Sequence, residues 1–263
     1  MRSPRCRAGR QDVTVHAPHP LRRKAAIERR RAALLLWALA GVMLPAAPAA
    51  AQLGGSVSLF SQARLRGQPI SDHRPVAELE LVRDSASGFY LGGSAALVAD
   101  RTKGLQPFAF KQYAGFAHRL SPGATLDLGV VHNGYTEYSG IVGGGSYTEA
   151  YIGIIGRNLS GRVFISPGYF RKDQATLYME VDGHLDLARN WVIVSHLGRL
   201  TYLNDDRPAG SPGGVTDWRL GLRRHMGSVD LEAAWTGYAE DKRPYGPGHD
   251  TGGALVIGLS LVF

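Results

Sequence analysis

Hydrophobic and polar residues alternate with a period of two in several segments of the chain. The clearest segment is 255–263, in which every second residue is Leu, Ile or Phe and the residues between them are small or mildly apolar. Successive side chains of a β-strand point to opposite faces, so this segment predicts a strand with one wholly apolar face. Segments 177–187 and 229–235 have the same period, with acidic residues between their apolar positions.

With these segments as templates, the sequence predicts about twelve strands. Their approximate ranges are 55–66, 75–84, 89–98, 108–119, 124–135, 146–156, 162–170, 176–187, 191–202, 215–225, 228–238 and 251–263. The connections alternate in length. Short turns are expected at 84–88, 120–123, 157–161, 188–190 and 226–227, and longer loops at 67–74, 99–107, 136–145, 203–214 and 239–250, with 171–175 as a short exception.

This alternation of short and long connections is typical of a transmembrane β-barrel with periplasmic turns and extracellular loops. Each unsatisfied backbone group costs several kcal/mol in lipid, so a sheet crosses a membrane only when it has no free edge. The sequence therefore predicts an all-β fold: one closed antiparallel barrel of about twelve strands, with the last strand paired to the first. An even number of strands places both ends of the barrel sequence on the periplasmic side.

The two faces of the predicted strands differ in character. Leu126, Leu128 and Val130 are expected to face acyl chains, and Asp127 and Gly129 the lumen. Aromatic residues near strand ends would suit the girdles that flank the apolar band of such barrels. These residues are Phe89, Tyr90, Phe108, Tyr135, Tyr147, Trp191, Trp218 and Trp235.

The first 51 residues have the parts of a secretory signal peptide in order. Basic clusters at 22–24 and 29–31 precede an apolar stretch at 32–44, and Ala49-Ala50-Ala51 forms a cleavage site of the small-residue type. The apolar stretch is shorter than the roughly 20 residues of a permanent transmembrane helix. We therefore expect an N-terminal extension with a Sec-type signal peptide at 1–51, cleaved after Ala51, and a barrel domain at 52–263.

Removal of this leader changes the charge of the chain. The full chain has 30 Lys and Arg and 22 Asp and Glu, of which the leader holds ten and two, so 20 of each sign remain. The basic isoelectric point therefore gives no support for nucleic-acid binding. Cys6 also leaves with the leader, so disulfides and thiol chemistry are excluded from residues 52–263.

A series of short motifs runs along the chain. It begins with Val57-Ser58-Leu59-Phe60-Ser61, Arg64-Leu65-Arg66-Gly67 and Ile70 to Pro75, and continues with 87–90, 147–153 and 216–221. Together these motifs resemble the TorF family of porin-like outer-membrane proteins of Gram-negative bacteria. Gln62-Ala63 and Pro69 depart from the family pattern in the first loop. The resemblance implies a channel-forming barrel in the outer membrane, in contact with lipid and lipopolysaccharide. It also implies that the terminal aromatic Phe263 is read by the barrel assembly machinery.

In such a channel the charges that face the lumen set selectivity. The candidate pore-lining residues are Arg64, Arg66, Glu78, Glu80, Lys111, Arg119, Asp127, Glu149, Glu180, Asp182, Asp186, Asp217, Arg219, Arg223, Asp230 and Glu232. Ten of them are acidic and six basic, which favours a weak preference for cations. Two alternatives stay open. The same charges could neutralise one another in a filled lumen, or the barrel could be a structural or adhesive protein whose proline-containing loops at 203–214 and 239–250 bind a partner.

Enzymatic functions have weaker support. His132, Asn133 and Ser139 offer residue types of an acyl hydrolase, but their spacing does not place His and Ser on one strand face. Asp205-Asp206 and His249-Asp250, in the expected loops, are the residue types with which a protease could activate water. The sequence shows no metal-ligand spacing and no phosphate-binding loop. We therefore expect a protein that is not an enzyme and has no cofactor; its solute and oligomeric state remain open.

Overall fold

The computed structural model describes residues 52–141, 143–204, 213–241 and 251–263. The predicted leader, most of the two proline-containing loops and the paired residues Asp205-Asp206 and His249-Asp250 lie outside this part of the chain. Among the described residues, no helix is long and apolar enough to cross a membrane.

The described residues form fourteen strands. In chain order they are β1 (Gln52–Phe60), β2 (Arg64–Leu65), β3 (Gln68–Pro69), β4 (Val76–Asp84), β5 (Phe89–Asp100), β6 (Gly104–Ser121), β7 (Ala124–Tyr135), β8 (Gly145–Gly156), β9 (Leu159–Ser166), β10 (Thr176–Ala188), β11 (Trp191–Tyr202), β12 (Gly214–Met226), β13 (Val229–Glu240) and β14 (Thr251–Val262).

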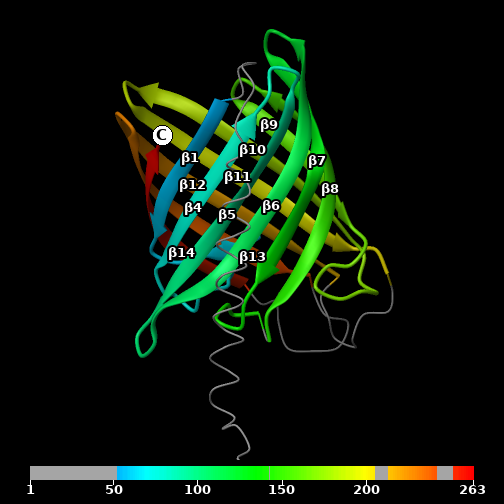
Figure 1. The fold of residues 1–263 in the computed structure, drawn as a ribbon, viewed down its shortest axis with the longest axis vertical. Helices are drawn as coiled ribbons and strands as arrows, with labels where there is room; N and C mark the ends of the chain where they lie inside the picture. Colours follow the sequence, from blue (N-terminus) through cyan, green and yellow to red (C-terminus); the bar gives the residue numbers. More distant parts are fainter. Residues whose placement is uncertain (1–51, 142, 205–212, 242–250) are drawn as a thin grey trace, which may run out of the picture. The chain divides into compact units, whose positions relative to one another are not determined.

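Twelve of these strands close into one antiparallel barrel, and β2 and β3 form a separate small hairpin (Figure 1). Each barrel strand pairs with its sequence neighbours, and β1 pairs with both β4 and β14. Short turns connect the strands at one end of the barrel, the upper end in Figure 1, and the longer connections lie at the other, together with the short β5–β6 turn at residues 101–103. The predicted all-β barrel of twelve antiparallel strands is confirmed.

The seam between β1 and β14 removes the last free edge of the sheet. Ser56 pairs with Val262 and Phe60 with Gly258. At the end of the seam, Gly55 and Phe263 exchange two backbone hydrogen bonds, at 2.9 and 3.0 Å between N and O. The pairing of the last strand with the first is as predicted, and it satisfies the backbone groups that an open edge would leave bare.

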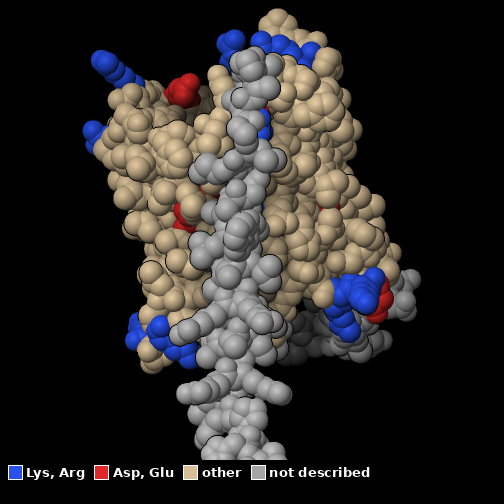
Figure 2. Space-filling model, viewed as in Figure 1, with Lys and Arg blue, Asp and Glu red and all other residues tan. Residues whose placement is uncertain are grey.

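Alternation along each strand separates an apolar outer face from a polar inner face. On β14, Leu255, Ile257, Leu259 and Leu261 are 42–55% exposed, whereas Val256, Gly258 and Ser260 line the interior. On β7, Leu128 and Val130 point outward and the Asp127 side chain is buried inside. On the visible face, Lys and Arg gather toward the two ends of the barrel, with mostly uncharged residues between them (Figure 2). This distribution suits a barrel surrounded by hydrocarbon at its middle.

Three boundaries differ from the sequence-based prediction. The predicted strand 162–170 is β9, Leu159–Ser166, so the connection predicted as a short exception at 171–175 spans residues 167–175. The predicted first strand, 55–66, ends at Phe60, and the chain then turns into the lumen. The predicted loop 99–107 is mostly strand, because β5 and β6 continue to Asp100 and Gly104 and leave only residues 101–103 as a turn. A register shift between Ala96 and Leu97 gives β6 one extra residue at that point. This bulge interrupts the alternation, which explains why the pattern there resembled a loop.

The predicted aromatic girdles are wrong for half of the residues proposed. Phe89 and Trp235 are exposed on the outer surface, as a girdle requires. Tyr90, Phe108, Tyr135 and Tyr147 instead lie in the interior, where they pack with other rings or bond to lumen carboxylates. Position near a strand end does not decide which face a side chain takes, since alternation decides it.

Candidate functional site

Residues 61–75, which connect β1 to β4, fold into the barrel interior; we call this segment the strap. Its β2–β3 hairpin turns at Arg66 and Gly67, both of which have positive φ, 48° and 75°. Two successive positive φ angles are typical of a type I′ turn, for which glycine is preferred at the second position. A Cβ atom on Gly67 would collide with the Gly237 carbonyl oxygen and the side chains of Asp217 and Tyr238. The tip of the strap therefore packs tightly against β12 and β13.

Hydrogen bonds fix the root of the strap near the barrel rim. The buried Ser71 hydroxyl accepts from the Ala63 amide and donates to the Arg74 carbonyl, both at 2.9 Å. The Gly140 amide donates to the Ile70 carbonyl at 2.6 Å, which joins the strap to the β7–β8 loop. Arg74 forms an ion pair with Asp100 at 3.0 Å and donates to the Tyr138 carbonyl at 2.7 Å. The segment predicted as an extracellular loop at 67–74 is thus an internal element with defined contacts.

The tip of the strap carries Arg66, which crosses to the opposite wall. Its Nη2 lies 2.6 Å from Glu149 Oε1 on β8, and both side chains are less than 10% exposed. Three rings surround the guanidinium, with centroids 4.0, 4.9 and 5.8 Å from its central carbon, in Tyr178, Tyr169 and Tyr147. We call these four partners the Arg66 cage. A buried guanidinium that is paired with a carboxylate and packed on rings is held strongly in place.

Between the strap and the short-turn end of the barrel, the lumen contains a cavity of about 990 Å³. It extends from strap residues such as Ala63 and Ile70 to Ser260 and Val262 near the short-turn end of β14. Its charged lining residues are Arg64, Arg66, Glu78, Glu80, Lys111, Glu149, Glu180, Asp217, Arg219, Arg223, Asp230 and Glu232, together with His196. Its lining residues come from the strap and from all twelve strands of the barrel.

A network of polar side chains also connects strands on the inner face of the barrel. The Tyr90 hydroxyl donates to Asp127 at 2.5 Å and also contacts the Tyr151 hydroxyl. Arg162 on β9 lies 3.1 Å from Asp127 and 3.7 Å from Glu180. This network joins β5, β7, β8, β9 and β10 across the interior and narrows the open part of the lumen.

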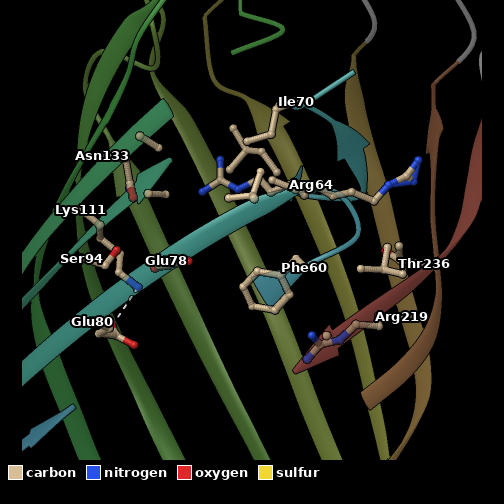
Figure 3. Close-up of a pocket in the computed structure, with 18 of the residues that line it drawn as sticks. Phe60, Arg64, Ile70, Glu78, Glu80, Ser94, Lys111, Asn133, Arg219 and Thr236 are labelled. Atoms are coloured by element: carbon tan, nitrogen blue, oxygen red, sulfur yellow. Dashed lines mark ion pairs between the residues drawn. The ribbon is translucent and has the colours of Figure 1, made fainter. Parts of the chain in front are cut away.

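Most of the charged residues that line the cavity are paired. Lys111 contacts Glu80 at 3.1 Å, as the dashed line in Figure 3 marks. Arg223 and Arg219 share Glu232, at 2.7 and 3.5 Å. Within the described part of the chain, Arg64 and Glu78 are the lining residues of the sequence-predicted set for which no ion pair is found. Arg64 Nε and Nη1 are buried without a hydrogen-bond partner, and burial lowers the pKa of its guanidinium.

The structure places the sixteen candidate pore residues in three groups. Twelve line the cavity: Arg64, Arg66, Glu78, Glu80, Lys111, Glu149, Glu180, Asp217, Arg219, Arg223, Asp230 and Glu232. Asp127 and Asp182 are inside but bonded within polar networks, to Arg162 and to His196. Arg119 and Asp186 are exposed at the short-turn end, each beside a register shift in its hairpin. The alternation that suggested an inward position fails at these shifts.

His196 is an interior residue that sequence reasoning missed. Its Nδ1 lies 2.8 Å from Asp182 and its Nε2 3.0 Å from Asp217, so both ring nitrogens contact carboxylates. Glu180, Asp182 and His196 also bring potential metal-ligand atoms within 4.8 Å of one another, although the sequence shows no such spacing. The pairing of β10 with β11 brings these side chains together. In the sequence, the one indication of an interior His196 was its place at an inward-facing position of its strand.

The residues considered for acyl hydrolysis make other contacts. His132 Nδ1 lies 2.9 Å from the Thr148 hydroxyl on the next strand, and its ring packs near Phe110. The Ser139 hydroxyl donates to the Thr136 carbonyl within its own loop, at 2.7 Å. No contact between His132 and Ser139 is found among the described residues.

The fold is similar to that of solved porins. The chain is similar to the "NanC porin" structure, with a TM-score of 0.51 and 12% identity over 80% of this chain and 99% of that one. It is also similar to "KdgM porin", with a TM-score of 0.50 and 10% identity over the same shares. At this identity the similarity concerns the fold alone.

The sequence itself matches a family model over residues 45–255. The chain therefore belongs to the family described as "Bacterial protein of unknown function (Gcw_chp)". No curated protein matches the sequence.

Proposed function

We propose that this protein is a porin-like channel for passive diffusion of small hydrophilic solutes or ions across the outer membrane of a Gram-negative bacterium. The observation that carries the proposal is that the barrel has an apolar outer face and a charged inner face. The outer face is apolar along the strands, and the inner face encloses a cavity of about 990 Å³ lined by charged side chains. Water-filled barrels combine these two faces in the same way.

The remaining expectations fit this proposal. Residues 1–51 act as an N-terminal extension and cleaved signal peptide, and the barrel then enters the outer membrane through its assembly machinery, which reads the C-terminal strand. Lipid and lipopolysaccharide surround the apolar face. We further propose that the family includes the TorF proteins that the sequence resembles, and that the protein is not an enzyme.

Recording from the purified barrel in planar bilayers tests the channel directly. We expect discrete, ohmic current steps in KCl, because the cavity offers polar lining to hydrated ions. The variant Lys111→Glu is expected to change the step size or the reversal potential, since it replaces the Lys111–Glu80 pair by two like charges. Correctly folded protein that gives no steps would contradict the channel.

A second function has support from the strap. It crosses the lumen and is fixed at both root and tip, and a polar network on β5 and β7–β10 also projects into the lumen. A barrel closed in this way could serve a structural or adhesive role. The same recording separates the two functions, because a closed barrel gives no steps in the wild type but gives them when the strap is released.

A further inference from the structure

Arg64 differs from the other basic residues that line the cavity. Arg66 is paired with Glu149, Lys111 with Glu80, and Arg219 and Arg223 with Glu232. For Arg64, no carboxylate partner is found among the residues that the structure describes, and two of its guanidinium nitrogens have no hydrogen-bond partner. An unpaired charge in a confined site is costly unless something compensates it.

Two further guanidinium groups enter the cavity from β12. Arg219 and Arg223 both line it and share one carboxylate, Glu232. Farther along the same wall, Asp230 contacts His225 Nδ1 at 2.6 Å, and Asp217 contacts His196 and Tyr178.

Among the described residues, Glu78 is the acidic lining residue for which no ion pair is found, and it lies on the opposite wall. In Figure 3, Glu78, Glu80 and Lys111 lie on one side of the cavity and Arg219 and Thr236 on the other, with Arg64 of the strap between them. Counting charges along the sequence gave ten acids and six bases, an excess of acids. Most of these residues are ion-paired in the structure, so this count does not give the sign of the free charge in the lumen. The charge that remains free at the strap is positive.

We propose that Arg64, which lines the cavity without an ion pair among the described residues, binds the oxyanion group of a small solute, a carboxylate or a phosphate. This inference rests on the proposed channel function, since it names the chemical class of solute that the lumen recognises. A guanidinium binds planar or tetrahedral oxyanions through charge-assisted hydrogen bonds. The rigid strap holds Arg64 in the lumen, because Arg66 and Gly67 on the same hairpin are fixed by the Arg66 cage and by β12–β13.

Binding can be measured without conduction, by calorimetric titration of the detergent-solubilised full barrel with citrate and, in a second arm, with inorganic phosphate. We expect saturable binding of at least one anion to the wild type. Arg64→Gln should weaken it by about tenfold or more, equivalent to about 1.4 kcal/mol. Arg64→Lys should recover part of the affinity. Glu78→Gln, a matched loss of one charge from the opposite wall, should not weaken it.

Conductance then separates this inference from the channel itself. In a KCl gradient, Arg64→Gln should shift the reversal potential toward cation selectivity, and Glu78→Gln should shift it the other way. Anion binding that depends on Arg64 in a barrel without current steps would refute the channel and leave the site. Current steps with no anion binding, or with binding that Arg64→Gln leaves unchanged, would refute the site and leave the channel. Electrophoresis of unheated samples verifies that each variant is folded.

Discussion

Replacement of Arg66 by alanine is expected to release the tip of the strap and to raise the single-channel conductance several-fold. The variant removes the 2.6 Å contact with Glu149 and the packing of the guanidinium on Tyr178 and Tyr169. It also leaves a buried carboxylate without its partner, a change that typically costs roughly 3–5 kcal/mol. This cost destabilises the conformation in which the strap is docked, so the conformation with the strap released becomes favoured. Planar-bilayer recording measures the result.

Two controls keep this prediction specific. Arg64→Ala shortens a neighbouring arginine of the same hairpin that has no ion pair in the described structure, so it should change selectivity more than step size. The double variant Arg66→Met with Glu149→Gln removes both charges together and should show a smaller increase than Arg66→Ala. Unchanged conductance in folded Arg66→Ala would mean that the root of the strap and Gly67 suffice to hold it.

Leu259→Arg is expected to abolish most of the folded barrel. Leu259 is the central residue of the outward apolar series at 255, 257, 259, 261 and 263, is 42% exposed, and pairs with Leu59 and Leu231. An arginine on the lipid face near the midplane costs roughly 2–4 kcal/mol. This cost matters more on β14 than on other strands, because loss of its pairing with β1 reopens the edge of the sheet. The folded fraction in lipid vesicles, measured by urea titration, tests the prediction.

The neighbouring residue supplies the matched control. Ser260 is adjacent in sequence but faces the lumen, where its hydroxyl bonds to that of Ser58 at 2.8 Å. Ser260→Arg places the same charge in the same strand on the polar side, and folding should largely survive. Equal loss of folding in both variants would argue against a hydrocarbon environment around the outer face.

The strand pattern could be predicted because a barrel wall imposes one rule on every residue. Each side chain faces either outward or inward, so Leu255–Phe263 and 177–187 carry the alternation without interruption. The rule fails where the register shifts, as at Ala96–Leu97 and beside Arg119 and Asp186. The error at 99–107 and the wrong placement of Arg119 and Asp186 lie at these shifts, whereas the early end of the first strand at Phe60 does not.

The strap could not be predicted, because its partners are distant in sequence. Residues 61–75 are polar and rich in turn formers, which also describes an external loop. What draws the segment inward is Arg66, whose carboxylate partner Glu149 lies 83 residues away, on a different strand. A single sequence gives the charge of each residue but not the pairing between them. For the same reason, counting lumen charges did not identify Arg64 as unpaired.

The seam has a consequence for the order of assembly. Ser58 and Ser260, which meet across the seam, are 202 residues apart in the sequence. Nearly all of the barrel strands must therefore form before the seam can close. The strap begins directly after β1, yet its tip binds residues on β8 and β10. The growing sheet must therefore curl around the strap, or the strap must enter a barrel that is already shut. If the first route holds, Arg66 and its cage act as a template for curvature, and variants that release the strap would also slow insertion.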